Sequence, residues 1–243
     1  MELAGRVALV TGAGQRIGQA LALALGARGM RLAVHYRGSI DGARATCEAV
    51  RAAGGEAHPF PADLAEADAP AALVDAAARH FGGLDVLVNS AAVMERTPVA
   101  EVTPAEWDAM FAVNLRAPFF CAQAAARAMG DRGGAIVNMA DLAAFETWPA
   151  YVPHTITKAG VVQMTRALAR ALAPRVRVNA IAPGVVLLPD GWDERASERL
   201  RGTTPLARHG SPEDVARAML YLLDADFVTG ETILVDGGRH VRR

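Results

Sequence analysis

Lysine is almost absent from this sequence. Lysine and arginine together number 25 among 243 residues, and Lys158 is the one lysine. Arginine is planar and effectively always charged, whereas lysine is a compact charge whose pKa depends on its surroundings. Chance survival of a solvated surface lysine is one explanation, since lysines are usually exposed. The other is a site that a guanidinium does not fit, and the residues around Lys158 favour it.

Net charge, cysteine and long apolar runs are also scarce. A formal charge of −1 gives no field that would attract nucleic acid or an anionic membrane, so we expect neither as a partner. Cys47 and Cys121 predict buried free thiols rather than a disulfide, in keeping with the cytoplasm. Glycines interrupt the N-terminal region and all longer apolar runs, so neither a signal peptide nor a membrane span is expected. The histidines and carboxylates show no metal-ligand spacing.

Short apolar runs alternate with helix-like stretches along the chain. Strands are predicted at 6–11, 30–36, 56–61, 84–89, 133–140, 175–181 and 231–236. This alternation predicts one α/β domain over 1–243, with a doubly wound parallel sheet of about seven strands and helices on both faces. Residues 185–210 form an irregular, tryptophan- and proline-containing stretch, which we interpret as a substrate-binding loop.

The first predicted strand runs into a glycine-rich turn and then a helix. Gly12, Gly14 and Gly18 allow the main chain to approach a phosphate, and a helix N-terminus favours negative charge. The strand before the turn and the helix after it are the context that a dinucleotide-binding turn requires. An ordinary glycine-bearing turn between a strand and a helix is the less favoured alternative.

The end of the second strand indicates which dinucleotide is bound. A site that prefers NAD places an acidic residue there to hold the ribose hydroxyls. The sequence reads HYRGS instead, with His35, Arg37 and Ser39, and no carboxylate follows until Asp41. A positive group and a hydroxyl suit a 2′-phosphate, so NADP(H) is favoured. A solvated loop arginine is the alternative.

Polar residues mark other strand ends. Asp63 either accepts a hydrogen bond from an adenine amino group or caps the next helix. Asn114, amid apolar neighbours, is either a locally satisfied buried group or a functional one. Asp141 follows a predicted strand at the edge where open α/β sheets bind ligands. His154 lies four residues before Lys158, so the two share one face of a helix.

Together these motifs resemble the short-chain dehydrogenase/reductases over essentially the full length. The matching pieces are TGAGQRIG at 11–18, Asp63, NSAA at 89–92, Asn114, NMAD at 138–141, Lys158 and RVNAIAPG at 177–184. Within that family the chain is most similar to the pteridine and dihydromonapterin reductases. Arg16 stands where most members have glycine, HYRGS is like that branch's NADP-binding turn, and Asp141 replaces the usual catalytic serine. The ending FVTGETILVDGGRHVRR is similar too.

The resemblance implies a Rossmann-like fold and hydride transfer from NADPH to a C=O or C=N group. It implies a homotetramer or homodimer formed through the helices at about 103–130 and 150–173, although core packing explains their small apolar residues equally well. The cofactor-binding residues that it implies are Gly12, Gly14, Arg16, Ile17, Gly18, His35, Tyr36, Arg37, Ser39, Asp63, Leu64, Asn89, Ser90, Ala91, Lys158, Pro183, Gly184 and Val185.

One departure from the family affects the chemistry directly. The catalytic tyrosine lies four residues before the lysine, and here that residue is His154. Histidine transfers protons near neutral pH, although a neighbouring ammonium disfavours its protonated form. Tyr151 offers a phenol one turn earlier, but Pro153 argues against a regular helix through it, so we rank it below His154. Met94 stands near the place where pteridine reductases stack an aromatic ring on the pterin.

Two interpretations follow from these residues. In the first, the chain is a reductase of a carbonyl or imine, for example in a dihydropterin-like heterocycle. Asp141 then orients or protonates the substrate, His154 supplies the proton, Lys158 holds the ribose and Asn114 supports a water relay, as the resemblance implies. In the second, the missing tyrosine marks a redox-inactive protein that binds NADP(H) as a sensor or assembly partner. Retention of Lys158 favours the first, although ribose binding alone would also retain it.

Overall fold

The computed structural model describes residues 1–188 and 194–241. All seven strands belong to one parallel sheet with the order β3-β2-β1-β4-β5-β6-β7, which confirms the predicted fold class. The strands are β1 (Val7–Val10), β2 (Arg31–Tyr36), β3 (Ala57–Pro61), β4 (Val86–Asn89), β5 (Gly134–Met139), β6 (Val176–Pro183) and β7 (Thr232–Val235).

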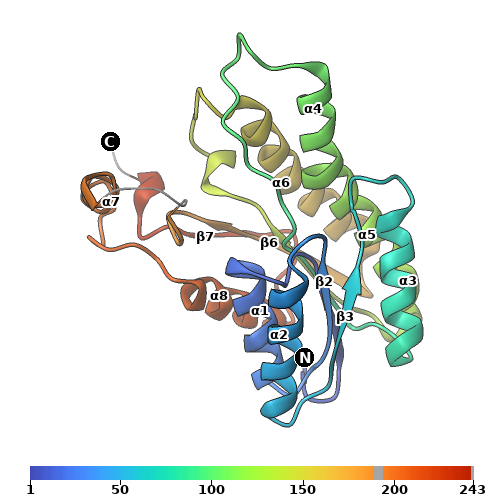
Figure 1. The fold of residues 1–243 in the computed structure, drawn as a ribbon. Coiled ribbons are helices and arrows are strands. Elements are labelled where there is room, and N and C mark those ends of the chain that lie inside the picture. Colours follow the sequence, from blue (N-terminus) through green and yellow to red (C-terminus); the bar gives the residue numbers. More distant parts are fainter. Residues whose placement is uncertain (189–193, 242–243) are drawn as a thin grey trace.

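Helices cover both faces of the sheet (Figure 1). On one face lie α1 (Arg16–Ala27), α2 (Ile40–Ala52) and α8 (Pro212–Asp224), and on the other α3 (Ala69–Phe81), α5 (Ala117–Met129) and α6 (Val152–Leu172). Successive side chains of a strand point to opposite faces. Strand β1 therefore contributes Ala8 and Val10 to the first core and Val7 and Leu9 to the second.

The long helix predicted from Thr103 is interrupted. Helix α4 (Pro104–Phe111) begins with a capping box, in which Thr103 and Glu106 satisfy each other's main-chain N–H groups. A π-helical turn, η1 (Ala112–Arg116), then leads into α5. Pro118 has no N–H to donate to the carbonyl of Asn114 four residues earlier, so the regular α-helical hydrogen bonding cannot continue there.

The expectation that 185–210 is irregular is wrong for part of that stretch. Residues Glu194–Gly202 form helix α7, in which Arg201 and Glu194 make an ion pair at 2.8 Å. Its sequence, ERASERLRG, is rich in good helix formers but has no continuous apolar stripe, so helix propensity acts here without the periodic signal that the prediction required. Trp192 belongs to 189–193, which lies outside the described residues.

Strand β1 is the point at which the winding of the sheet reverses. The chain proceeds outward through β2 and β3, then returns to place β4 on the other side of β1. Ligands of open α/β sheets bind at the carboxyl ends of the strands at such a point.

Cys47 and Cys121 are buried free thiols, as predicted. Within residues 1–188 and 194–241, no helix is long and apolar enough to cross a membrane.

Candidate active site

A hollow of about 580 Å³ lies at the carboxyl ends of the first four strands of the chain. It brings together most of the cofactor-binding residues expected from the sequence. Its walls come from the glycine turn after β1, the end of β2, the turn after β3 and the segment after β4. The lining residues are Gly12, Gln15, Arg16, Ile17, Gly18, His35, Tyr36, Arg37, Gly38, Ser39, Asp63, Leu64, Ser90, Ala91, Ala92, Val93 and Val113.

The glycine turn packs too closely for side chains. Gly12 has φ +67°, and a Cβ there would lie 2.9 Å from the Cα of Ala91. A Cβ on Gly18 would overlap the carbonyl oxygen of Gly12, so the start of α1 lies directly against the turn. Gly14 instead faces Ser39, whose hydroxyl a Cβ would overlap. Gly12 and Gly18 thus shape the hollow, whereas Gly14 serves the packing of the turn against the β2–α2 connection.

The N-terminus of α1 presents uncapped main-chain donors. Gln15, its N-cap residue, makes no side-chain cap, and the first turn has no acidic residue. Arg16 begins the helix with φ +52° and an exposed side chain that lines the hollow. The left-handed region costs a non-glycine residue about 1–2 kcal/mol. Positive charge, a helix dipole and unpaired N–H groups therefore meet here, as an anionic ligand requires.

His35 borders the hollow but is almost fully buried, with 2% of its surface exposed. The Gly12 N–H donates to its Nδ1 at 3.0 Å, and its Nε2 lies 3.1 Å from the carbonyl oxygen of Ala62. A carbonyl only accepts, so Nε2 carries the proton and the ring is neutral. Burial lowers the pKa of His35, against the opposing effects of the Ala62 carbonyl and Asp63. The exposed positive group at the end of β2 is therefore Arg37.

Two other polar residues are placed by their own contacts. Asp63 does not cap α3, which begins at Ala69; its Oδ1 accepts from Ala65 N–H at 2.9 Å within the turn, and the residue lines the hollow. Asn89 is buried, and its Nδ2 donates to Asn138 Oδ1 at 2.9 Å, which joins β4 to β5. Some of the cofactor-binding residues expected from the sequence are described in the structure but do not line the hollow. They are Gly14, Asn89, Lys158 and 183–185.

Lys158 is buried, which argues against a surface lysine kept by chance. The residue is 4% exposed, and its Nζ donates to the main-chain carbonyl of Met139 at 2.9 Å. Burial lowers the pKa of the ammonium, and the nearby Asp141 carboxylate opposes this shift. Helix α6 begins at Val152, with Pro153 in its first turn as expected, and carries both Lys158 and His154 on one buried face.

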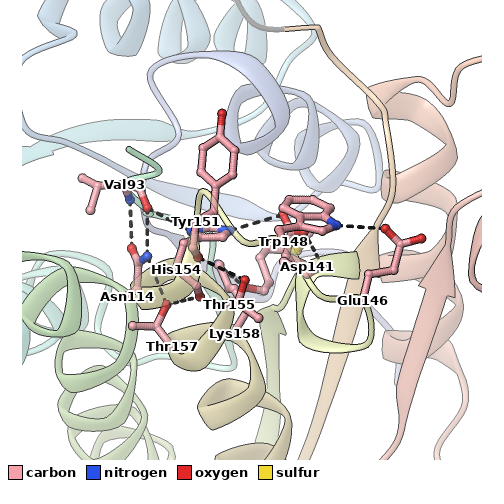
Figure 2. A network of polar contacts seen from close by, with 12 residues as sticks. Val93, Asn114, Asp141, Glu146, Trp148, Tyr151, His154, Thr155, Thr157 and Lys158 are labelled. Atoms are coloured by element: carbon pink, nitrogen blue, oxygen red, sulfur yellow. Dashed lines mark hydrogen bonds and ion pairs between the residues drawn. The ribbon is translucent and has the colours of Figure 1, made fainter. Parts of the chain in front are cut away.

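His154 faces Asp141 across a short gap (Figure 2). Its Nδ1 lies 3.3 Å from the carbonyl oxygen of Val93, and its Nε2 lies 3.7 Å from Asp141 Oδ2. Because the Val93 carbonyl only accepts, Nδ1 carries a proton. Nε2 is buried and makes no hydrogen bond within the described residues. A polar ring atom thus stays uncommitted beside a carboxylate at the ligand-binding edge of the sheet.

Asn114 fixes the main-chain group on which His154 rests. Its Oδ1 accepts from Val93 N–H at 2.8 Å, and its Nδ2 donates to the Val93 carbonyl at 2.8 Å. The same Nδ2 lies 3.3 Å from Thr157 Oγ1 on α6. Of the two alternatives for Asn114, local satisfaction describes its side chain. Through Val93 it also positions His154, which no pattern in the sequence indicates, because the contact runs through a main-chain carbonyl.

Tyr151 is turned away from this group. Its ring points away from His154 and Asp141 (Figure 2), and its centroid lies 6.2 Å from that of Trp148. Trp148 Nε1 in turn donates to Glu146 at 2.9 Å. The lower rank given to Tyr151 as a proton donor agrees with this orientation.

Comparisons with known proteins agree with the geometry. The family model described as enoyl-(acyl carrier protein) reductase matches residues 12–240. A 3-oxoacyl-[acyl-carrier-protein] reductase of Staphylococcus aureus is 36% identical over 240 residues, covering 96% of this chain and 98% of that protein. A mutant short-chain dehydrogenase/reductase of Serratia marcescens is similar in structure, with a TM-score of 0.93 and 35% identity. The match covers 99% of this chain and 100% of that protein. A blue fluorescent protein from a metagenomic library, in complex with NADPH, is also similar, with a TM-score of 0.92 and 33% identity. The match covers 98% of this chain and 99% of that protein.

Proposed function

The chain belongs to the short-chain dehydrogenase/reductase family of oxidoreductases, and we propose that it reduces a C=O or C=N group with NADPH. The observation that carries this proposal is the convergence of Lys158, His154 and Asp141 at the edge of the sheet that also holds the hollow. A buried lysine and an uncommitted imidazole nitrogen near the same carboxylate are a costly arrangement for a purely structural role.

NADP(H) is the cofactor that fits the hollow. The uncapped start of α1 and the exposed Arg16 suit the pyrophosphate, while Arg37 and Ser39 suit a 2′-phosphate where an NAD site would carry a carboxylate. A structure similar over nearly its full length was determined with NADPH. Lys158 would hold the nicotinamide ribose, and Asp63 the adenine end.

The proton comes from His154 in the proposed reaction. Bound NADPH would supply the hydride that the carbon of the substrate C=O or C=N group receives. The Val93 carbonyl holds the proton on Nδ1, so only Nε2 gains or loses a proton at the Asp141 side. The protonated ring donates Nε2–H to the substrate oxygen or nitrogen and becomes neutral, leaving an alcohol or amine and NADP⁺. Asp141 orients the substrate and pairs with the ring while it is charged.

A dihydropterin-like heterocycle is the substrate class that we propose. Asp141 supplies a carboxylate for ring nitrogens. Met94, which follows Val93 in the chain, and Phe145, which ends the turn that begins at Asp141, are both exposed. The test is NADPH oxidation with dihydrobiopterin, dihydromonapterin and dihydrofolate, beside a 3-oxoacyl thioester and simple ketones. Turnover of a dihydropterin supports the proposal. Inactivity on all three in a folded, cofactor-binding sample removes the pterin class, and turnover of the thioester alone would replace it.

Residues 185–210, with helix α7, form the substrate-binding loop in this proposal, and α5 and α6 form the contacts of a homotetramer or homodimer. Phe119, Phe120 and Ile156 on those two helices are exposed, which suits a subunit interface. Light scattering after size-exclusion chromatography measures the mass directly. A monomer at micromolar concentration would contradict the oligomer.

Replacing Arg16 with glycine is expected to weaken NADPH binding about tenfold or more without destabilising the fold. The arginine loses its charge near the phosphates, while glycine relieves the positive φ at this position. Calorimetric titration with NADPH and thermal unfolding measure the two effects. Arg44→Gly, on an exposed face of α2, is the matched control for loss of an arginine. Unchanged NADPH affinity in the Arg16 variant would contradict its role at the phosphates.

A second candidate function is a redox-inactive NADP(H)-binding protein, which the absence of a phenol at position 154 favours. Replacing His154 with tyrosine separates the two. If His154 is the proton donor, this variant loses about 100-fold or more of an existing reductase activity. Asparagine at 154 is the matched control, because its amide still reaches the Val93 carbonyl but carries no titratable nitrogen. Activity gained by the tyrosine variant of an inactive parent would favour the second function instead.

A further inference from the structure

His35 joins the glycine turn to the turn that carries Asp63, and we propose that its neutral ring positions both for the cofactor and makes cofactor affinity depend on pH. This rests on the proposed use of NADP(H). His35 stands at the end of β2 with 2% of its surface exposed. Its Nδ1 accepts from Gly12 N–H at 3.0 Å and its Nε2 donates to the Ala62 carbonyl at 3.1 Å. One side chain thus ties two separate walls of the hollow together.

The His35 ring satisfies a main-chain N–H group that the surrounding main-chain hydrogen bonds leave without an acceptor. Main-chain hydrogen bonds already join Ala13 N–H to the His35 carbonyl at 2.8 Å and Ala62 N–H to the Tyr36 carbonyl at 3.1 Å. Neither bond involves Gly12 N–H. Among the described residues, its acceptor is His35 Nδ1. The Gly12 carbonyl lies directly against Gly18 at the start of α1, so a shift of Gly12 displaces the helix end that faces the phosphates. His35 is therefore a positioning residue, which acts through the Gly12 amide.

Protonation of the ring removes its acceptor. With a proton on each nitrogen, the Gly12 N–H would face another N–H, and the bond between ring and turn would break. The charged group that faces His35 from the neighbouring turn is Asp63, which favours the protonated ring, as does the Ala62 carbonyl. The glycine turn presents only the uncharged Gly12 amide, and Arg37 on the ring's own strand end is exposed. Burial is the largest effect and lowers the pKa of His35, so the neutral ring predominates at neutral pH.

Affinity for the dinucleotide is expected to fall as the pH is lowered. The folded, cofactor-competent state requires the neutral ring, and the pKa of His35 lies below its ordinary value of 6.5. Affinity for the dinucleotide is therefore full above that range and falls as the pH is lowered through the pKa of His35. Because the 2′-phosphate of NADP⁺ itself changes charge near about pH 6, NAD⁺, which lacks it, reports on the protein alone.

The test is calorimetric titration of the full-length protein with NADP⁺ and NAD⁺ between about pH 5 and about pH 8. In the wild type, the Kd for each dinucleotide rises as the pH is lowered toward the acid end. His35→Asn keeps an acceptor for Gly12 N–H but does not titrate, so its Kd at about pH 8 is lower than that of His35→Leu and changes little with pH. His35→Leu loses both bonds, and its Kd is about tenfold higher at every pH.

Thermal unfolding of each variant shows that it is folded under the titration conditions. An asparagine variant with the same acid-side loss of NAD⁺ affinity as the wild type would overturn the inference. So would a folded leucine variant that binds both dinucleotides as well as the wild type. A wild type that binds neither dinucleotide at any pH would overturn the proposed function itself, which separates the two failures.

Discussion

Replacing Lys158 with methionine is expected to remove at least about 99% of the reductase activity while leaving the protein folded. Methionine has a similar length and is apolar, so it fills the buried space without a charge. Lys158 is 4% exposed, and its ammonium donates a hydrogen bond to the carbonyl of Met139. Removing the ammonium relieves the cost of burying a charge, whereas the Met139 carbonyl left unpaired costs about 1–3 kcal/mol. The two effects oppose each other, so we expect the free energy of unfolding to change little.

The stability of this variant also has a defined pH dependence relative to the wild type. Burial lowers the pKa of Lys158 in the folded protein, whereas the unfolded chain keeps its ordinary value of 10.5. Between these two values the unfolded state binds more protons, so the wild type becomes more stable as the pH rises. The methionine variant lacks this term. Chemical denaturation at several pH values is expected to show its relative stability falling as the pH approaches 10.5.

Lys158→Arg is the control for charge. It keeps a cation at position 158, but a guanidinium is larger, planar and far less able to lose its charge on burial. We expect it to be both inactive and less stable than the methionine variant. An arginine variant as active and as stable as the wild type would contradict the inference that a guanidinium does not fit this site. Methionine-variant activity within about tenfold of the wild type would remove Lys158 from the reaction.

The sequence predicted the sheet because its signals are local. Apolar runs and glycine turns each lie within a few residues, and the seven strands appear where the apolar runs predict them. Helix α7 was missed because its residues favour a helix without an apolar stripe. The π-turn at Asn114 was missed because it depends on Pro118, four residues later, breaking a helix that is otherwise well supported.

For the candidate site, the sequence indicated residues but not their contacts. The spacing of His154 and Lys158 placed both on one face of a helix, and α6 carries them so. The carbonyl of Val93 carries no sequence signal, although it fixes the proton on His154 and accepts from Asn114. The motif at the end of the second strand did not show that His35 is buried, and only its two main-chain partners identify a neutral ring. Main-chain partners across the sheet depend on the assembled fold.

Replacing Gly18 with alanine is expected to raise the Kd for NADPH at least about tenfold and to destabilise the protein by about 1–3 kcal/mol. The added Cβ would overlap the carbonyl oxygen of Gly12, which is main chain and cannot rotate away. Either Gly12 or the start of α1 must move, and both line the hollow. Gly12 also holds the hydrogen bond to His35, so the disturbance extends to the wall carrying Asp63.

Gly38→Ala is the matched control for this change. Gly38 lines the same hollow, yet a Cβ there meets nothing within 4 Å. Its variant is expected to bind NADPH with nearly the wild-type Kd and to unfold at nearly the wild-type temperature, measured by calorimetric titration and thermal unfolding. Equal effects of the two substitutions would mean that the hollow tolerates no added side chain anywhere. Wild-type binding by Gly18→Ala would mean that the close approach of α1 to the glycine turn is not what holds the phosphates.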